Sequence, residues 1–323
     1  MAETMAEFAK AQANEGKYLV AGIADWTLMQ SNVLQILPWQ TNKELVAKII
    51  AWQSFPTVGT RKINASFSES TGKYKHKIED KYIFGHYIDM DTVLVDAGGD
   101  RNNQRKASAK AMGFKFNDMF INGDPASDEF KGLYSRVTDA YNAGYTDQYF
   151  DAGSSTTGRG VLYDATEQHH FLDQIAKAIE VTAEGNPDCM FMNQKLYLCV
   201  ESATRRQNLL KQDKDMFGRI INLYGTVPIY KMGPVSAFST TLIMPNSEAL
   251  SSGTDETSIV TCKFGEEEYL WGIQQKSLEV YDHGRISSSS VYRDEVSWVV
   301  GLAVSNPRSV TRAYGFVADN GAS

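Results

Sequence analysis

Regular alternation of apolar and polar residues between Ala47 and Ile88 constrains the fold of this chain more than any other feature of its sequence. Ile63, Ala65 and Phe67 share one side of an extended segment, which is the pattern of a half-buried β-strand. Gly72 supplies a turn, and the strand that returns from it places two sets of residues on opposite faces. These sets are Tyr74, His76 and Ile78 on one face and Lys73, Lys75 and Lys77 on the other.

The predicted hairpin, residues 46–88, has too few apolar residues to fold alone. Two-stranded ribbons are only marginally stable in water, because ordering the chain costs conformational entropy that burial must offset. We therefore expect the hairpin to lie on another surface and to carry its lysines at the tip.

A long helix is predicted from Asp100 to Ile121, with a length of roughly 33 Å. Asn122 and Gly123 would end it, since the residue after a helix is often a glycine in the left-handed conformation. Asp124 and Pro125 would start the following turn. The predicted apolar side consists of Ala107, Ala111, Phe114, Met119 and Ile121.

Shorter elements follow, and together they predict an α+β fold. We expect a helix over Phe171–Thr182, a buried strand over Cys189–Met192 and a helix capped by Asn193. Beyond Phe217 the pattern is mostly that of strands. Residues 1–45 mix short helical patches with polar breaks, so we expect an arm there that lies outside the core.

Composition narrows the class of protein. A chain of 323 residues with 42% hydrophobic side chains can bury a core and is predicted to form two or more lobes. No apolar run is long enough for a membrane span, and three widely spaced cysteines favour reduced core residues in a cytoplasmic setting. A net charge of −7 argues against a general nucleic-acid binder.

One basic run stands out from this acidic background. Arg101 and Arg105, like Lys106 and Lys110, are four residues apart and would share a helix face. A solvated helix face is the favoured interpretation, and weak contact with a polyanion is the alternative.

Several polar segments are candidate sites of chemistry. The loop with Asp124, Asp128 and Glu129 lacks the ligand spacing of a calcium loop, and GSSTTGRG lacks the lysine of a phosphate-binding loop. His169 and His170 are adjacent, so they diverge on a helix and favour a surface position. Glu266, Glu267 and Glu268 form a charged turn between strands. No catalytic, cofactor-binding or metal-binding residue is therefore predicted.

The order of the parts, with several local sequences, resembles the major capsid proteins of tailed bacteriophages, which have the Hong Kong 97-type capsid fold. The stretches that carry the resemblance are SNVLQILPW, the hairpin, DRNNQRKASAKAMGFKFNDMFINGDPASDEFKGL, CMFMNQKLYLCV, FGRIINLYGTVPIYKMG, TSIVTCKFGEEEYLWGIQ, LEVYDHG and EVSWVVGLAVSNPRSVTRAYG. The resemblance implies four regions. They are an N-terminal arm (1–45), an extended hairpin loop (46–88), a peripheral domain with a spine helix (89–150 and 276–323) and an axial domain (151–275).

The resemblance also implies function. The chain would self-assemble into the hexamers and pentamers of an icosahedral shell around double-stranded DNA, with only weak, non-specific DNA contact. A portal, a separate scaffolding protein and decoration proteins are the other partners that it suggests, in a virion assembled in the host cytoplasm. The separate scaffold is expected because residues 1–45 leave no room for a cleaved scaffolding segment before the hairpin. We do not predict crosslinking of subunits.

The charged residues singled out above become interface candidates. Lys73, Lys75 and Lys77 would contact an adjacent subunit from the hairpin tip. Arg101, Arg105, Lys106 and Lys110 would face a neighbour or the lumen. Glu266, Glu267 and Glu268 would lie in the axial lobe or at its junction. Two alternatives stay open: an encapsulin nanocompartment shell of the same fold, and a metal- or nucleotide-dependent enzyme that uses the acidic loop.

Overall fold

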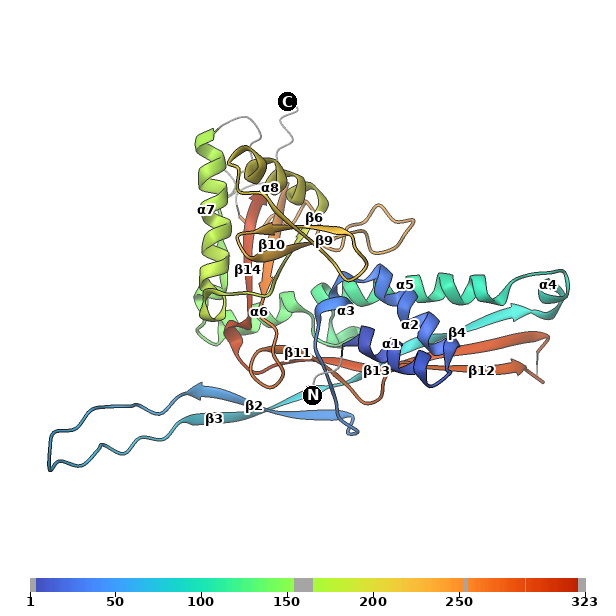
Figure 1. Cartoon of the computed structure of the whole chain (residues 1–323), viewed down its shortest axis with the longest axis horizontal. Coiled ribbons are helices and arrows are strands. Elements are labelled where there is room, and N and C mark those ends of the chain that lie inside the picture. The colour runs from blue at the N-terminus through green and yellow to red at the C-terminus, as the bar shows by residue number, and fades with distance from the viewer. Residues whose placement is uncertain (1–3, 154–164, 252–254, 288, 319–323) are drawn as a thin grey trace.

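The computed structural model describes residues 4–153, 165–251, 255–287 and 289–318. It has three parts (Figure 1): a lobe built on a seven-stranded sheet, a long arm of strands and helices that extends from its base, and a β-hairpin that points the opposite way. Helices and strands mix in one chain, so the predicted α+β class is confirmed.

The long arm is organised around helix α5, Arg101–Asn122. Asp100 is the N-cap of this helix, and its carboxylate accepts a hydrogen bond from the Asn102 amide. The predicted long helix is therefore confirmed. Its predicted apolar side is partly wrong, because Ala107 and Ala111 are exposed. The buried side runs one residue further on, through Ser108, Ala109, Met112, Phe116 and Phe120. Alanine tolerates either environment, so the spacing of alanines did not fix the orientation of the first turns.

Gly123 ends α5 for a different reason from the one expected. Its φ is −49°, so the left-handed conformation is absent there. A Cβ at this position would lie 2.2 Å from the carbonyl oxygen of Phe130, and the Gly132 amide donates to the Gly123 carbonyl at 2.8 Å. Close backbone approach requires the glycine. Asp124 and Pro125 start the following turn as predicted, in the 3₁₀ helix η1, Pro125–Ser127.

A five-stranded sheet lies against α5. Its central strand is β13, Val291–Val304, which pairs on one edge with β4, Tyr82–Asp91, and on the other with β12, Glu279–Arg285, and β11, Leu270–Gln274. The short strand β1, Trp39–Thr41, runs parallel to β11, and α4, Thr92–Asp96, connects β4 to α5.

The N-terminal helices belong to the core of the arm. They are α1, Met5–Asn14, α2, Tyr18–Gln30, and α3, Asn32–Ile36, and Figure 1 shows them beside α5. Phe8, Ile23 and Leu34 are buried in the same cluster as the α5 side chains. The expectation that this segment lies outside the core is wrong. Its polar breaks are the helix ends, and its apolar residues surround α2 too evenly for a one-sided pattern to appear.

The lobe contains the seven-stranded sheet. In spatial order its strands are β5, Tyr149–Asp151, β14, Val310–Val317, β10, Glu256–Cys262, β6, Cys189–Asn193, β9, Val227–Met232, β8, Ile220–Tyr224, and β7, Lys211–Lys214. Helices α7, Ala165–Val181, and α8, Gln194–Arg206, pack on it, and α6, Leu133–Asn142, lies at its base. Short 3₁₀ helices are η2, Thr146–Gln148, η3, Ala183–Gly185, and η4, Pro307–Ser309.

Two predictions for the lobe are confirmed and one boundary shifts. Strand β6 is wholly buried, and the Asn193 side chain accepts a hydrogen bond from the Leu196 amide at the start of α8. However, β14 pairs within the lobe and β11 within the arm. The predicted division at residue 275 therefore cuts across both sheets, because the chain crosses between them twice near its end.

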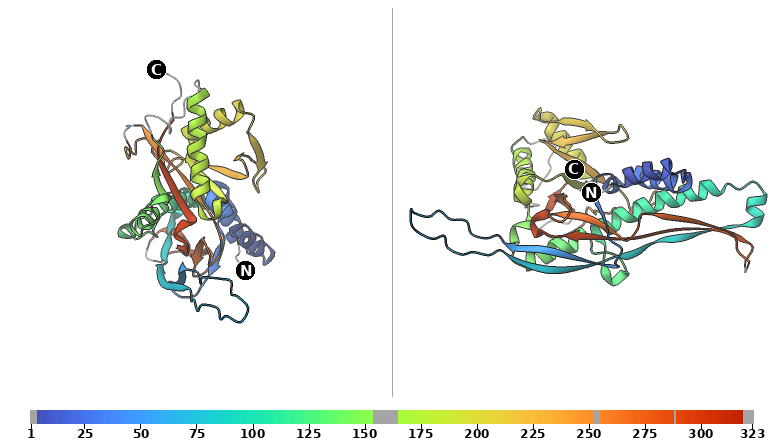
Figure 2. Two further views of the ribbon diagram at one scale, coloured as in Figure 1. Left: turned by 90° about the vertical axis from the view of Figure 1, so that its left-hand side faces the viewer. Right: turned by 60° about the horizontal axis from the view of Figure 1, so that its bottom comes forward.

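The first strand of the hairpin is formed by a different segment from the one predicted. Strand β2, Val46–Ser54, pairs with β3, Lys73–Asp80, and residues 55–72 form a long loop without a strand (Figure 2). The strand expected around Ala65 is therefore wrong. Ile63 and Phe67 lie in this loop with exposed fractions of 92% and 64%. Alternation alone did not make a strand, since residues 55–72 have no neighbouring strand to pair with and the Ala65 amide instead donates to the Lys62 carbonyl at 3.1 Å.

Candidate assembly surfaces

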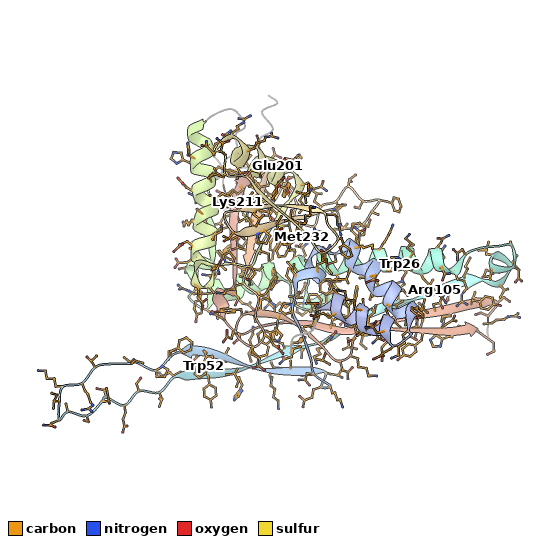
Figure 3. The ribbon with its side chains drawn as sticks, in the orientation of Figure 1. Trp26, Trp52, Arg105, Glu201, Lys211 and Met232 are labelled. Carbon is orange, nitrogen blue, oxygen red and sulfur yellow. The ribbon has the colours of Figure 1, made fainter. Side chains whose placement is uncertain are left out.

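The hairpin exposes an apolar face to solvent. Ile50 and Trp52 of β2 and Tyr74 and Ile78 of β3 are between 48% and 64% exposed. Trp52 lies 5.9 Å from the Tyr74 ring, centroid to centroid, and Figure 3 shows it where the hairpin leaves the body. Contiguous exposed apolar side chains of this kind mark interaction surfaces. Within one subunit the hairpin therefore lacks the covering surface that its sequence requires.

The predicted lysines are not at the hairpin tip. Lys73 begins β3, and Lys75 and Lys77 lie on the face that turns toward α6. Lys77 forms an ion pair with Glu79 at 2.7 Å. The tip is formed instead by residues 55–72, because β3 starts only after that loop.

A buried ion pair fixes the base of the hairpin. Arg136 of α6 donates two hydrogen bonds to Glu79, at 2.7 and 2.9 Å, and a third to the Leu302 carbonyl at 2.8 Å. Burial of Glu79 favours its neutral form, but the charge and hydrogen bonds of Arg136 outweigh this, so the pKa of Glu79 lies below its ordinary value. The hairpin is thus anchored at its base, and the Ser305 hydroxyl adds a hydrogen bond to the Ile50 carbonyl at 2.8 Å.

Lys81 makes a second anchor that sequence reasoning missed. Its ammonium group donates to three backbone carbonyls, of Asn42 at 2.5 Å, Glu44 at 2.8 Å and Gln274 at 3.2 Å. Burial lowers the pKa of Lys81. Lys81 thus adds to the backbone bond from the Asn42 amide to the Gln274 carbonyl, at 2.8 Å, in holding the segment that leads into the hairpin to β11. No motif in the sequence distinguishes it from the other lysines.

A groove runs between the hairpin and the base of the lobe, and we call it the hairpin groove. It has a volume of about 470 Å³ and is lined by Trp52, Lys75, Lys77, Ala140 and Pro307 among others. An adjoining hollow of about 440 Å³ adds residues of the turn between β10 and β11.

That turn contains the predicted glutamates. Glu267 and Glu268 are exposed and line the hollows beside the hairpin, and Glu267 accepts a hydrogen bond from Gln40 at 3.1 Å. Glu266 is half-buried. Their location at the junction of lobe and hairpin follows the prediction, whereas an interface role for them stays a prediction.

The basic run divides into two kinds of residue. Arg101 and Arg105 form ion pairs within the subunit, because both bind Asp282 and Asp294 at 2.7 to 3.0 Å. We call these four residues the arginine cluster. Hydrogen bonds to Asp294 and its charge raise the pKa of Arg105. The expectation that these arginines face a neighbour or the lumen is therefore wrong.

Lys106 and Lys110 are exposed on the same helix. Lys106 lies 5.8 Å from the ring of Trp26, which Figure 3 labels on α2. For these two lysines, a solvated face and a weak polyanion contact both stay predictions.

The carboxylates of the acidic loop have structural partners. Glu129 forms an ion pair with Lys115 at 2.6 Å, and Asp124 caps the η1 turn. His169 and His170 are exposed on α7, as expected. The described part of the chain contains no group of three or more His, Cys, Asp and Glu residues that could hold a metal ion. Most of GSSTTGRG lies outside the described residues.

The three cysteines are free and buried. Burial strongly raises the pKa of the Cys189 thiol, which disfavours the reactive thiolate. Among the described helices, none is both long and apolar enough to cross a membrane.

Comparison with known proteins gives a fold but no sequence relative. No family model and no curated protein matches the sequence. The structure is similar to the SrpI encapsulin of Synechococcus elongatus, with a TM-score of 0.61 at 13% identity over 89% of this chain and 88% of that one. It is also similar to the capsid of a native GTA particle (TM-score 0.57, 15% identity, 88% and 89% covered).

A third similar structure is from Mycobacterium phage Bobi, with a TM-score of 0.56 and 9% identity over 88% of this chain and 89% of that one. The described chain therefore has the Hong Kong 97-type capsid fold that phage capsids and encapsulins share, and its structural neighbours are shell proteins.

Proposed function

We propose that this chain is the major capsid protein of a tailed phage and forms the pentamers and hexamers of an icosahedral shell that packages double-stranded DNA. The observation that carries the proposal is the hairpin, which is anchored at its base by the Arg136–Glu79 pair and bare of cover on the face of Trp52 and Tyr74. A subunit lattice supplies the missing burial, because a neighbouring copy can cover that face.

The acidic surface supports a container for DNA over a DNA-binding protein. A net charge of −7 keeps the affinity for packed phosphates low, since each neutralised phosphate adds salt-dependent affinity. Lys106 and Lys110 are the candidates for weak lumen contact. A portal, a separate scaffolding protein and decoration proteins are proposed as further partners, with assembly in the host cytoplasm, and no catalytic activity is proposed.

An encapsulin shell is the second candidate, and the similarity to the SrpI encapsulin favours it. The chemistry of the contents separates the two. Shells purified after expression with the neighbouring genes should hold nuclease-protected double-stranded DNA if the protein is a phage capsid. A co-purifying cargo enzyme without protected DNA would identify an encapsulin. An enzyme that uses the acidic loop is the weakest candidate, and a thermal shift with Mg²⁺ or nucleotides would support it.

Negative-stain microscopy of the expressed full chain tests the shell proposal directly. Closed shells of uniform size are expected. A persistent monomer under all assembly conditions would contradict the proposal.

The lysines of β3 are tested in the same assay. Lys73→Glu with Lys75→Glu should impair shell formation and leave the subunit folded, and Lys77 is left unchanged because it pairs with Glu79. Normal shells from this variant would remove these lysines from the interface.

A further inference from the structure

An exposed phenylalanine stands at the tip of the loop between β9 and β10. Phe238 has an exposed fraction of 101%, against 93% for Val58 in the hairpin loop. We call residues 233–244 the Phe238 loop. In Figure 1 this loop projects from the lobe on the side away from α7, and in Figure 3 it begins beside Met232, the last residue of β9.

The Phe238 loop is held in one shape by its own hydrogen bonds. The Val235 amide donates to the Thr241 carbonyl at 2.9 Å, and the Ser239 amide donates to the Ser236 carbonyl at 3.2 Å. The base of the loop is anchored in the core, where Ile243 and Met244 are 1% and 0% exposed. An ordered loop loses little conformational entropy on binding, so the aromatic side chain at its tip is preorganised to anchor the loop in a partner surface.

The Phe238 loop itself carries no charged side chain. Residues 232–247 contain no Asp, Glu, Lys, Arg or His, in a chain with 22% charged residues. Depletion of charge around an exposed aromatic side chain is typical of the centre of a protein interface. A nucleic acid or an anionic surface would instead select basic residues here.

The receiving surface is expected on another face of the same protein. A side chain that enters a hollow on a different face of the next copy makes a head-to-tail contact, which forms a ring when the rotation between copies closes. A side chain that enters a hollow in its own surface patch allows the same patch of two copies to pair, which gives a two-fold dimer. The hairpin groove lies at the base of the lobe on the side from which the hairpin extends, opposite the Phe238 loop. Its lining includes Val137, Ala140, Val304 and Val310, so it offers an apolar floor.

We propose that the partner of the Phe238 loop is a second copy of this chain, and that Phe238 enters the hairpin groove of the next subunit in a ring. This inference rests on the proposed shell function and names a contact within it. The rival hollow, of about 310 Å³ and lined by Thr226, Pro228 and Tyr230, lies on β9 and its neighbouring turn, next to the loop itself. A contact there would give dimers.

Fluorescence and assembly of position 238 variants test whether the side chain becomes buried. Phe238→Ala should raise the protein concentration needed for assembly by about tenfold or more, which is the effect of losing an aromatic anchor. Phe238→Trp should assemble. On assembly its tryptophan emission should shift to shorter wavelength by more than the emission of the wild type shifts. Leu198→Ala, at an exposed position on α8, is the matched control and should assemble like the wild type.

Disulfide trapping tests the location. Ala143 is exposed on the rim of the hairpin groove, so Phe238→Cys with Ala143→Cys should give a ladder of crosslinked multimers on a non-reducing gel. The three native cysteines are buried and do not compete. Phe238→Cys with Thr226→Cys is the control, and preferential crosslinking of that pair into dimers would overturn the head-to-tail contact.

The outcomes separate the two proposals. Shells that form normally with Phe238→Ala, together with an emission of Phe238→Trp that does not shift, would overturn the Phe238 contact and leave the shell function standing. A wild-type chain that never self-associates would overturn both.

Discussion

Arg136 and Glu79 join the base of the hairpin to α6 through two hydrogen bonds, and their side chains are only 5% and 10% exposed. Removing one member of a buried ion pair leaves the other charged and without its partner. We therefore expect Glu79→Gln to lower the free energy of unfolding by about 3 kcal/mol, measured by urea denaturation at neutral pH. The double variant Glu79→Leu with Arg136→Met should recover most of this loss. A Glu79→Gln variant as stable as the wild type would contradict the anchor.

The same pair makes stability depend on pH. The pKa of Glu79 in the folded protein lies below its ordinary value of 4.5. Its contribution to stability is therefore complete above the unfolded pKa and is lost as the pH falls through the folded pKa. The difference in the free energy of unfolding between the wild type and Glu79→Gln should be constant from about pH 6 to 7, because Glu79 is ionised there in both the folded and the unfolded state. The difference should narrow below about pH 4.5. A difference that grows on acidification would contradict this assignment.

The arginine cluster predicts unequal effects for its two carboxylates. Asp294 is 3% exposed, whereas Asp282 is 40% exposed. Asp294→Asn should lower the free energy of unfolding by about 3 kcal/mol, and Asp282→Asn by about 1 kcal/mol or less, because solvent screens the exposed pair. Urea midpoints of the two variants provide the measurement. Equal effects would mean that the cluster acts as a surface network.

Close packing of α2 on α5 depends on Gly113. A Cβ at this position would lie 2.9 Å from both the Thr27 carbonyl oxygen and the Gln30 Cβ. Gly113→Ala should therefore lower the free energy of unfolding by about 1 to 3 kcal/mol through overpacking. Gly22→Ala is the matched control on α2, where a Cβ meets nothing within 4 Å. It should be neutral or should stabilise the helix by up to about 1 kcal/mol, and thermal unfolding of both variants decides the matter.

The exposed hairpin face predicts a separation of folding from assembly. Trp52 is 48% exposed in the single subunit and contacts the Tyr74 ring, so Trp52→Ser should lower the free energy of unfolding by only about 0.5 to 1.5 kcal/mol. Shell formation, followed by light scattering and microscopy, should require a higher protein concentration. Leu198→Ser on α8, also exposed, is the comparison. Equal assembly of the two variants would remove Trp52 from the interface.

Features that depend on local periodicity and on the chemistry of helix ends were predictable from the residues alone. The 22-residue helix α5, the buried strand β6 and the Asn193 cap follow from spacing and from a short polar side chain before a helix. The resemblance to capsid proteins led to the fold because the order of such elements survives at low sequence identity. The need of the hairpin for an outside surface was likewise evident from its few apolar residues.

Contacts between residues far apart in the sequence became known only from the folded chain. Arg101 and Arg105 look like a solvated face in the sequence, and only the return of β12 and β13 places Asp282 and Asp294 beside them, nearly two hundred residues later. The partners of Lys81 are backbone carbonyls, which leave no trace in side-chain patterns. The strand expected around Ala65 failed for the related reason that a strand exists only where another strand pairs with it. Long-range pairing is the physical quantity that a local pattern does not contain.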